Sequence, residues 1–509
     1  MIFSRNSLIR SLQLVVVCFF TSGYTAYSQL NEELQGIFED HELMGMSVVR
    51  VCGEDVESFH FGLKDYSREL SVDDSTMYRI ASISKTVSAL GLMKLYEQEL
   101  FQLDDDVSDF IGFELRNPNW PDVPITFRMV LSHTSSIQDG TGYNGFLGDT
   151  FSFDATPPSI SELLTPVGNA YTSNMFRQEN PGTYFAYSNI NYGVVATLIE
   201  AISGVRFDVY MRENILQPLG IAGSYNVGDI QNIDNVAVLY RNQNGWTAQA
   251  DNYQGVFPVP LFLDNYTIGT NGLIFGPQGS LRISPTDLAR ILLTMKNGHY
   301  QGISILEQAT IELMQEPQWT YDGSNGDNYY GLFRSWGLGV HCTTDTNGGD
   351  VLCLGNLFKG HPGEAYGLIS DMYWFSSESI NGGFIFMTNG SFNGFDFGNE
   401  SAFYTLEEDV FTAICSNGFE SCFLPVENLQ SSQPSLYPNP NSGRFSIMLT
   451  QDILPTSTFK IYDHSGRIVH SGVISNDATF SLPEPVPGLY IDVILTPSGK
   501  LFRLPFSVH

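Results

Sequence analysis

The sequence predicts a chain of mixed α and β structure (α/β, in an α+β arrangement) that ends in a small all-β module. Three observations indicate this. Residues 83–96 are apolar on nearly every side, which is typical of a helix buried inside a large domain. Segments between residues 46 and 388 alternate polar and apolar residues as strands do. Beyond residue 435 the period-2 pattern continues alone, which predicts a small β-sandwich.

The individual elements follow from residue spacing and from turn residues. The expected helices are residues 30–41, 83–96, 194–202, 288–295 and 403–414. The expected strands are residues 46–51, 58–62, 336–340, 360–367, 372–375 and 383–388, and in the final module residues 445–449, 459–461 and 489–495. A long aromatic and glycine-rich stretch over residues 140–180 is of the kind that lines sites.

Composition limits the possible partners. The 509 residues carry a formal net charge of −31, from 55 acidic and 24 basic residues. Such an excess of negative charge argues against a nucleic-acid partner and against binding to an anionic membrane surface. The length leaves room for two or three domains with a large core.

The N-terminus has the pattern of an export signal. Arg5 and Arg10 precede the apolar stretch 14–20, and Ala26 and Ser28 form a small-x-small cleavage site. The apolar stretch is too short to remain as a membrane anchor, and no later segment is long and apolar enough to span a membrane. We therefore expect a signal peptide (residues 1–28), a main domain (29–425), a polar linker (426–434) and a C-terminal all-β domain (435–509).

Five cysteines remain after the expected signal peptide, and outside the cytoplasm they can oxidise. Cys342 and Cys353 flank a turn, which favours a bridge across a hairpin, and Cys415 and Cys422 are close enough in sequence to close a short loop. Cys52 is then the odd thiol, although spacing alone does not prove a pairing. No Cys/His grouping has metal-ligand spacing, so neither a metal nor a cofactor is expected.

Ser82 and Lys85 form a Ser-x-x-Lys pair at the start of the buried helix. Residues three apart share a helix face, so the Lys85 amine can reach the Ser82 hydroxyl, and the helix N-terminus favours developing negative charge there. A serine activated by a neighbouring base is what acyl transfer requires. The alternative is a helix cap beside a surface lysine. Ser457 and Lys460 repeat the pattern within an expected strand, so the motif alone is weak.

Two further positions are candidates by residue type. Tyr187 and Asn189 form a Tyr-x-Asn triplet at a loop-to-helix junction, although residues 240–242 and 437–439 contain the same triplet. His133 is a catalytic base by type, but a His-Thr-Ser run that closes a helix is more often structural, and we favour that interpretation.

Three motifs in one order resemble the serine β-lactamase-like family, which includes class C β-lactamases, penicillin-binding D,D-peptidases and related esterases. They are Ser-Ile-Ser-Lys at residues 82–85, Tyr-Ser-Asn at 187–189 and His-Pro-Gly at 361–363, and the resemblance covers roughly residues 30–415. It implies a β-lactamase/transpeptidase-like fold, with an antiparallel sheet flanked by helices and an all-helical part. No Gly-x-Ser-x-Gly elbow is present, which argues against an α/β-hydrolase.

The resemblance also implies the roles of the site residues. Ser82 would attack a carbonyl to form an acyl-enzyme, and Lys85 and Tyr187 would share the proton transfers, with the base left open between them. The implied oxyanion and substrate-binding residues are Asn189, His361, Gly363 and Glu364, where the backbone N–H groups of Ser82 and Glu364 form the oxyanion hole.

Two departures from the family pattern bear on the substrate. Pro362 stands where many relatives have a hydroxyl residue, and His361 stands where they have a permanently charged one. Both weaken recognition of a substrate carboxylate, which favours esters or less charged peptides. A charged role for His361 predicts a rate that varies between about pH 5 and 8.

The C-terminal module resembles type IX secretion C-terminal sorting domains, and an immunoglobulin-like adhesion module is the alternative. The motifs that carry this resemblance are Leu-Tyr-Pro-Asn-Pro at residues 436–440, Ile-Tyr-Asp at 461–463 and Pro-Gly-Leu-Tyr at 487–490. The resemblance implies the type IX secretion machinery as a partner and a secreted or cell-surface protein.

Two functions are then open. The first is an exported serine hydrolase that acts through an acyl-enzyme on an ester, amide or peptide bond of a small-molecule or peptide substrate (esterase or D-amino-acid peptidase type, with β-lactamase activity unresolved). The alternative is a catalytically weak substrate-binding or scaffolding protein on the same fold. The intact set of Ser82, Lys85 and Tyr187 favours the enzyme.

Overall fold

The structure is a computed structural model. It describes residues 28–152, 156–242, 244–261, 263–377, 380–417, 419 and 422, and in the C-terminal module residues 436–437, 443–447, 457–463, 467–474, 479–483, 486–495 and 501–508. The chain divides into two compact units, Met1–Phe423 and Leu424–His509. Almost all of the expected signal peptide, and the whole expected linker, lie outside the described residues. Among the described helices, none is long and apolar enough to cross a membrane.

A nine-stranded sheet forms the centre of the first unit, in the order β3-β2-β1-β13-β12-β11-β10-β9-β8, and neighbouring strands pair antiparallel throughout. Its strands are β1 (Gly45–Cys52), β2 (Asp55–Asp65), β3 (Leu70–Ser71), β8 (Trp319–Thr320), β9 (Ser335–Trp336), β10 (His341–Cys342), β11 (Phe358–Ala365), β12 (Leu368–Phe375) and β13 (Gly382–Thr388). The expected antiparallel sheet is therefore confirmed.

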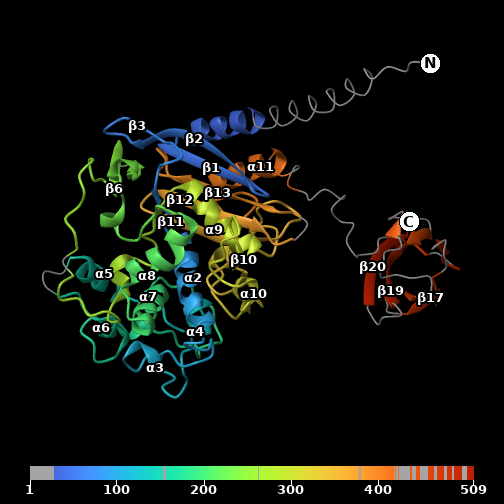
Figure 1. The fold of residues 1–509 in the computed structure, drawn as a ribbon, viewed down its shortest axis with the longest axis horizontal. Coiled ribbons are helices and arrows are strands. Elements are labelled where there is room, and N and C mark those ends of the chain that lie inside the picture. The colour runs from blue at the N-terminus through green and yellow to red at the C-terminus, as the bar shows by residue number, and fades with distance from the viewer. Residues whose placement is uncertain are drawn as a thin grey trace. The chain divides into compact units, whose positions relative to one another are not determined.

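Helices cover both faces of this sheet (Figure 1). The main helices are α2 (Ile83–Glu97), α4 (Phe127–Leu131), α5 (Tyr143–Phe151), α7 (Ile190–Ser203), α8 (Phe207–Met211), α9 (Pro285–Asn297), α10 (Gln308–Gln315) and α11 (Thr405–Asn417), with shorter α3 (Ser108–Ile111) and α6 (Ser161–Leu164) and an N-terminal helix over residues 28–40. Alternate residues of one strand enter different cores. Val49 packs with α2, α7 and α9, whereas Val48 packs with the N-terminal helix and α11.

The chain enters α2 through a short strand and a strained turn. β4 (Tyr78–Arg79) pairs with β7 (Arg282–Ile283) outside the main sheet. Ala81 then takes a left-handed backbone conformation, with φ of 46°, although it has a side chain. Non-glycine residues in this region cost free energy and are concentrated at functional sites. The turn places Ser82 directly at the N-terminus of α2.

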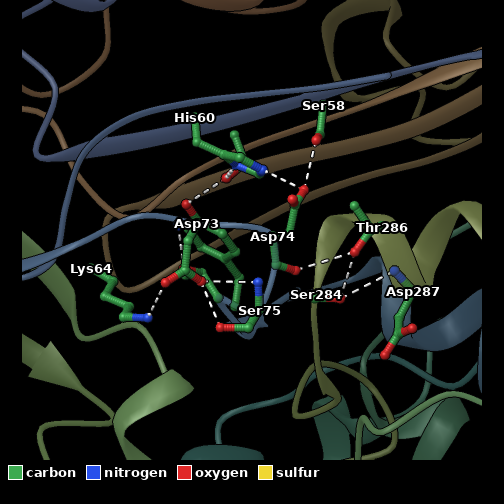
Figure 2. Close-up of polar contacts among 12 residues, drawn as sticks. Ser58, His60, Lys64, Asp73, Asp74, Ser75, Ser284, Thr286 and Asp287 are labelled. Atoms are coloured by element: carbon green, nitrogen blue, oxygen red, sulfur yellow. Dashed lines mark hydrogen bonds and ion pairs between the residues drawn. The ribbon is translucent and has the colours of Figure 1, made fainter. Parts of the chain in front are cut away.

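A network of polar side chains fixes the segment before β4 (Figure 2). The His60 ring on β2 lies between two partners, with Nδ1 3.0 Å from Ser47 Oγ and Nε2 2.9 Å from Asp74 Oδ1. Thr286 at the start of α9 donates to the backbone oxygen of Asp74, at 3.2 Å. The Ser47 hydroxyl is also 2.9 Å from the hydroxyl of Tyr78. The network thus ties β4, and with it the entry to Ser82, to the sheet and to α9.

One expected strand is wrong. Residues 336–340 alternate in polarity, but only Ser335–Trp336 and His341–Cys342 are strands. Gly337 instead donates its N–H to the Val340 oxygen at 2.8 Å, and Gly339 has a φ of 75°. The two glycines therefore make the turn of a hairpin, which a count of alternating residues does not distinguish from a strand.

The expected disulfides are also wrong. The structure pairs Cys52 with Cys422 and Cys353 with Cys415, and leaves Cys342 as a buried free thiol. Cys342 belongs to the core that holds α2, whereas Cys353 belongs to the core on the other sheet face. The sheet thus separates Cys342 from Cys353, the two thiols that were expected to form a bridge across a hairpin. Burial raises the pKa of the Cys342 thiol to about 12.

The second unit contains two small antiparallel sheets, in the orders β14-β15-β18 and β17-β16-β19-β20. Its strands are β14 (Leu436–Tyr437), β15 (Arg444–Ile447), β16 (Thr458–Asp463), β17 (Ile468–Val473), β18 (Thr479–Ser481), β19 (Gly488–Leu495) and β20 (Leu501–Val508). One apolar core joins both sheets, for instance through Phe445 of the first and Phe459 of the second. The expected all-β sandwich is confirmed, and Lys460 of the second Ser-x-x-Lys pattern lies in its strand β16.

Candidate active site

Ser82 and Lys85 are in hydrogen-bonding contact, with 2.9 Å between Oγ and Nζ. The Lys85 amine has two further partners, since it donates to Asn189 Oδ1 at 2.8 Å and to the Gln278 oxygen at 2.9 Å. Both of these oxygens can only accept hydrogen bonds. They therefore take the two hydrogens of a neutral amine and leave its lone pair for the Ser82 hydroxyl.

The Lys85 side chain is fully buried. Burial lowers the pKa of Lys85 to about 7, while the nearby Asp139 carboxylate acts in the opposite direction. Removal from water disfavours the charged form of an amine, and this effect is the larger of the two here. A substantial fraction of Lys85 is therefore a neutral amine at neutral pH, which is the state that can accept a proton.

Tyr187 lies in the loop just before α7, with its ring centroid 4.8 Å from Lys85 Nζ. Burial raises the pKa of Tyr187 well above its ordinary value, and a hydrogen bond with Ser82 opposes this effect only in part. The phenol is therefore protonated at neutral pH. The structure thus brings the hydroxyl, the amine and the phenol that the sequence singles out around one point, from α2 and from the start of α7.

Asp139 holds this arrangement, although no sequence motif singles it out. Its Oδ2 accepts from the backbone N–H of Asn189 at 3.0 Å and from Asn189 Nδ2 at 2.8 Å, and its Oδ1 accepts from the Ile190 N–H at 2.9 Å. A carboxylate at the N-terminus of α7 is favoured by the helix dipole. Because it can only accept, Asp139 fixes the Asn189 amide with Nδ2 towards itself and Oδ1 towards Lys85.

Strand β11 lies alongside Ser82. A side chain added at Gly363 would put its Cβ 3.1 Å from the Ser82 nitrogen and 2.5 Å from Ser370 Oγ, so only glycine fits. Among the backbone hydrogen bonds of the described residues, none is donated by the Ser82 N–H. Strand β10 pairs with β11 only at residues 359–360, so β11 has a free edge at Pro362, which has no N–H to leave unpaired.

His361 lies on β11 without exposed surface. Its Nδ1 is 2.6 Å from the Pro362 oxygen, which requires the hydrogen on Nδ1. Burial lowers the pKa of His361 well below its ordinary value, and the Lys85 charge acts in the same direction. The imidazole is thus neutral at neutral pH, which argues against a charged role for His361. Its ring centroid is 6.0 Å from that of Tyr187, so it contributes to the wall beside the phenol.

His133 is buried and lies behind Tyr187, with 4.5 Å between their ring centroids. Its Nδ1 accepts from the Ser188 N–H at 3.1 Å. Burial lowers the pKa of His133 well below its ordinary value, and the charge of Lys85 adds to this. Because it binds the backbone between Tyr187 and Asn189, His133 is a structural support, as the sequence favoured.

Glu364 follows Gly363 on β11, opposite Ile369 of β12. Its exposed side chain accepts from the Tyr404 hydroxyl at 2.9 Å, away from Ser82. Any contribution of Glu364 to the site is therefore made by its backbone N–H, as the sequence predicts, and not by its carboxylate. No group of His, Cys, Asp or Glu within the described part of the chain could hold a metal ion.

Two family models match the chain. The model described as "Beta-lactamase" covers residues 30–407, and the model described as "Secretion system C-terminal sorting domain" covers residues 435–501. These ranges correspond to the two compact units of the structure.

Relatives and solved structures show similarity over different lengths. Penicillin-binding protein 4* of Bacillus subtilis is 25% identical over 266 residues, which are 51% of this chain and 54% of that protein. Protein flp of Staphylococcus aureus is 28% identical over 159 residues, which are 31% of this chain and 30% of that protein. The chain thus spans about half or less of the length of these relatives.

Among solved structures, the octameric penicillin-binding protein homologue from Pyrococcus abyssi has a TM-score of 0.57 at 20% identity, over 95% of this chain and 96% of that one. The D-amino acid amidase from Ochrobactrum anthropi SV3 has a TM-score of 0.54 at 20% identity, over 79% of this chain and 99% of that one. At these identities the likeness shows a common fold.

Proposed function

Since the chain belongs to the beta-lactamase family, we propose that it is an exported serine hydrolase that acts through an acyl-enzyme on an ester, amide or peptide bond. The observation that carries the proposal is the fully buried Lys85 amine, 2.9 Å from Ser82 Oγ, with a pKa lowered to about 7. Burial of an amine beside a serine hydroxyl lowers the stability of the fold. Its presence is explained if the neutral amine is the base in acyl transfer.

The acylation step follows from the hydrogen bonds. The Lys85 lone pair accepts the Ser82 proton as Oγ attacks the substrate carbonyl, because Asn189 and Gln278 hold the other amine positions. Negative charge then develops on the carbonyl oxygen. We infer that the Ser82 N–H at the start of α2 and the Glu364 N–H stabilise this charge, which the closeness of Gly363 to the Ser82 nitrogen supports.

Loss of the leaving group needs a proton at the departing atom. Tyr187 can supply it, because its phenol is protonated at neutral pH and is hydrogen-bonded to Ser82. The proton held on Lys85 then returns to the phenolate, so that both groups recover their starting protonation states. In the second half of the reaction a water molecule attacks the ester on Ser82, and the same groups return the proton to Oγ. This scheme assigns the base to Lys85 and the acid to Tyr187, a choice that the sequence left open.

Export is part of the function. The C-terminal module is a type IX sorting domain, which indicates secretion or display at the cell surface. We expect the substrates to be small molecules or peptides outside the cell. Esters and D-amino-acid amides or peptides are the first classes to test, since one structural neighbour is a D-amino acid amidase.

The test is covalent labelling of the full chain with a fluorophosphonate probe and with a fluorescent penicillin. We expect wild type to be labelled and Ser82→Ala to be unlabelled. Ser457→Ala is the matched control, because it removes the other Ser-x-x-Lys serine and should be labelled like wild type. Turnover of p-nitrophenyl esters, nitrocefin and D-amino-acid amides then sorts the substrate classes. A folded wild type with neither labelling nor turnover that depends on Ser82 would make the chain a binding protein instead.

A further inference from the structure

A cavity of about 290 Å³ lies next to the segment that leads into Ser82. Its lining combines basic and apolar side chains, among them Arg79 on β4, Tyr366 in the turn after β11, Phe151 at the end of α5, and Val259 and Leu261 in the loop that follows β6 (Trp246–Ala250). The acylation steps described above use none of these residues.

Arg79 carries an unbalanced charge into this cavity. Its Nη2 donates to Ser280 Oγ at 2.7 Å and its Nε to the Gly279 oxygen at 3.3 Å, both of them neutral acceptors. The face of the guanidinium lies over the Tyr366 ring, 4.9 Å from the centroid. Within the described residues, Arg79 forms no ion pair with a carboxylate. The three remaining N–H bonds of its guanidinium are therefore available to a ligand.

The nearest carboxylate is already occupied. Asp251 accepts from Arg282 through both oxygens, at 2.7 and 3.0 Å, and also from the Tyr253 hydroxyl at 3.0 Å. Asp251 is therefore paired with Arg282, and its two oxygens accept no hydrogen bond from Arg79. Burial lowers the pKa of Arg79, and the charge of Arg282 lowers it further. In a chain with a net charge of −31, this cavity has a local excess of positive charge.

The rim of the cavity is apolar and open to solvent. Val259 is 92% exposed, Phe151 46%, Tyr366 44% and Leu261 40%. Exposed apolar side chains that gather around a charged group are typical of a binding site for an amphiphilic ligand.

Two segments that line the cavity also carry parts of the active site. Arg79 precedes Ser82 by three residues. On the other segment, Ser280 lies two residues after Gln278, and the Gln278 backbone oxygen accepts from Lys85. A Cβ added at Gly279, which lies between them, would be 3.7 Å from Ala81. The cavity is therefore adjacent to the segments 79–82 and 278–280, which carry Ser82 and the Gln278 oxygen that binds Lys85.

We propose that this cavity binds the carboxylate and the apolar chain of the substrate, so that the hydrolase prefers anionic esters or amides with a carboxylate on an apolar chain. The proposal rests on the proposed function. Under this proposal the carboxylate is recognised from β4. It is not recognised from β11, where Pro362 and His361 weaken binding of a carboxylate. The planar guanidinium of Arg79 suits a two-pronged contact with a carboxylate.

The first test compares two substrates that differ only in charge, p-nitrophenyl hydrogen suberate and its neutral methyl ester. We expect wild type to favour the acid in kcat/KM by roughly tenfold or more, mainly through KM, as for one charge-assisted contact. In Arg79→Gln this ratio falls to about one, and Arg79→Lys restores part of it. Val259→Asp, which adds a negative charge at the rim, lowers the ratio without touching Arg79.

Arg241→Gln is the matched control, because Arg241 lines a different cavity and its loss should leave the ratio at the wild-type value. A second measurement does not need turnover: calorimetric binding of octanoate and octanamide to Ser82→Ala, with and without Arg79→Gln. We expect octanoate to bind more tightly than octanamide to Ser82→Ala. In the variant that also carries Arg79→Gln, the two ligands should bind equally. A wild-type ratio near one, or equal binding of acid and amide, overturns the anion site and leaves the hydrolase intact. Arg79-dependent octanoate binding without any turnover would instead keep the site and remove the proposed hydrolase function.

Discussion

The Asp139 carboxylate binds the side-chain amide of Asn189, with 2.8 Å between Oδ2 and Nδ2, and so turns Asn189 Oδ1 towards Lys85. The orientation of one amide therefore decides whether the Lys85 amine meets an acceptor or a donor. Asp139 touches neither Ser82 nor Lys85 by hydrogen bond in the described structure, so it is a positioning residue.

Asp139→Asn should lower kcat roughly 10- to 100-fold with a small effect on KM, because Asn189 can then turn its NH₂ towards Lys85. The substitution has a second, specific consequence. The Asp139 charge raises the pKa of Lys85. Loss of this charge should therefore shift the rise in activity to a lower pH. Steady-state kinetics over a pH series measures both effects. A fall in kcat with an unshifted pH profile would mean that Asp139 supports only the fold.

The pH dependence of wild type should report Lys85. Since burial lowers its pKa to about 7, the neutral amine predominates above that pH, and kcat/KM should rise as the pH increases through about 7. His361 is buried and neutral, so its removal should not abolish this rise. We expect His361→Asn to keep the rise near pH 7, whatever its effect on the maximum rate. A profile that becomes flat in His361→Asn would transfer the titration to the imidazole.

Gly363→Ala tests the approach of β11 to the nucleophile. The added methyl group would lie 2.5 Å from Ser370 Oγ and 3.1 Å from the Ser82 nitrogen, so the strand must move away. Displacing one donor of an oxyanion hole costs roughly 100- to 1,000-fold in kcat. We expect a loss of this size at a temperature well below the melting temperature of the variant, where its chain is folded. Gly360→Ala is not a suitable control, because a Cβ there would lie 2.0 Å from the Met372 oxygen.

The sequence predicts some parts of this molecule and not others for physical reasons. Ser82 and Lys85 are near in sequence and lie on one helix, so their contact follows from helical spacing. Tyr187 needed the family resemblance, because nothing local places a loop tyrosine beside α2. Asp139 is a single aspartate in a loop, and its role depends on the position of α7. The charge balance around Arg79 likewise depends on Arg282, which only the pairing of β4 with β7 brings near.

The cysteines show the same limit. Sequence separation favoured short loops, whereas the sheet assigns each thiol to one face, and both observed bridges close long segments, of 62 and 370 residues. Which face a cysteine occupies depends on strand register, and that is set by contacts far along the chain.

The pairing gives a prediction for the chain from residue 29 onwards. Thiol titration of the unfolded, unreduced protein should find one thiol, Cys342, and titration of the folded protein should find none, because Cys342 is buried. Cys415→Ser should lower the free energy of unfolding by roughly 2–5 kcal/mol, since it opens the bridge to Cys353. Cys342→Ser adds no free thiol and breaks no bridge, and it serves as the control. Mass mapping that instead finds Cys342 in a bridge would contradict the structure.

Two buried carboxyl groups predict how stability depends on pH. Asp371 on β12 is fully buried, and neither of its oxygens has a hydrogen-bond partner within the described residues. Glu407 on α11 is likewise buried and accepts from the Tyr404 N–H at 2.7 Å. Burial raises the pKa of both carboxyl groups above the ordinary range, and the Glu407 charge raises the pKa of Asp371 further. Both groups therefore tend to keep their protons at neutral pH.

A carboxyl group with a raised pKa in the folded state binds more protons there than in the unfolded chain, so its stabilising contribution is lost as the pH rises through the raised value. The melting temperature of wild type should accordingly fall between about pH 6 and pH 9, as two buried like charges form between β12 and α11. Asp371→Asn replaces one of the two carboxyl groups by an amide that cannot ionise, and its melting temperature should fall less over the same range. Asp409→Asn, on the exposed side of α11, is the control and should follow wild type. Parallel curves for wild type and Asp371→Asn would mean that ionisation of these two carboxyl groups does not set the pH dependence of stability.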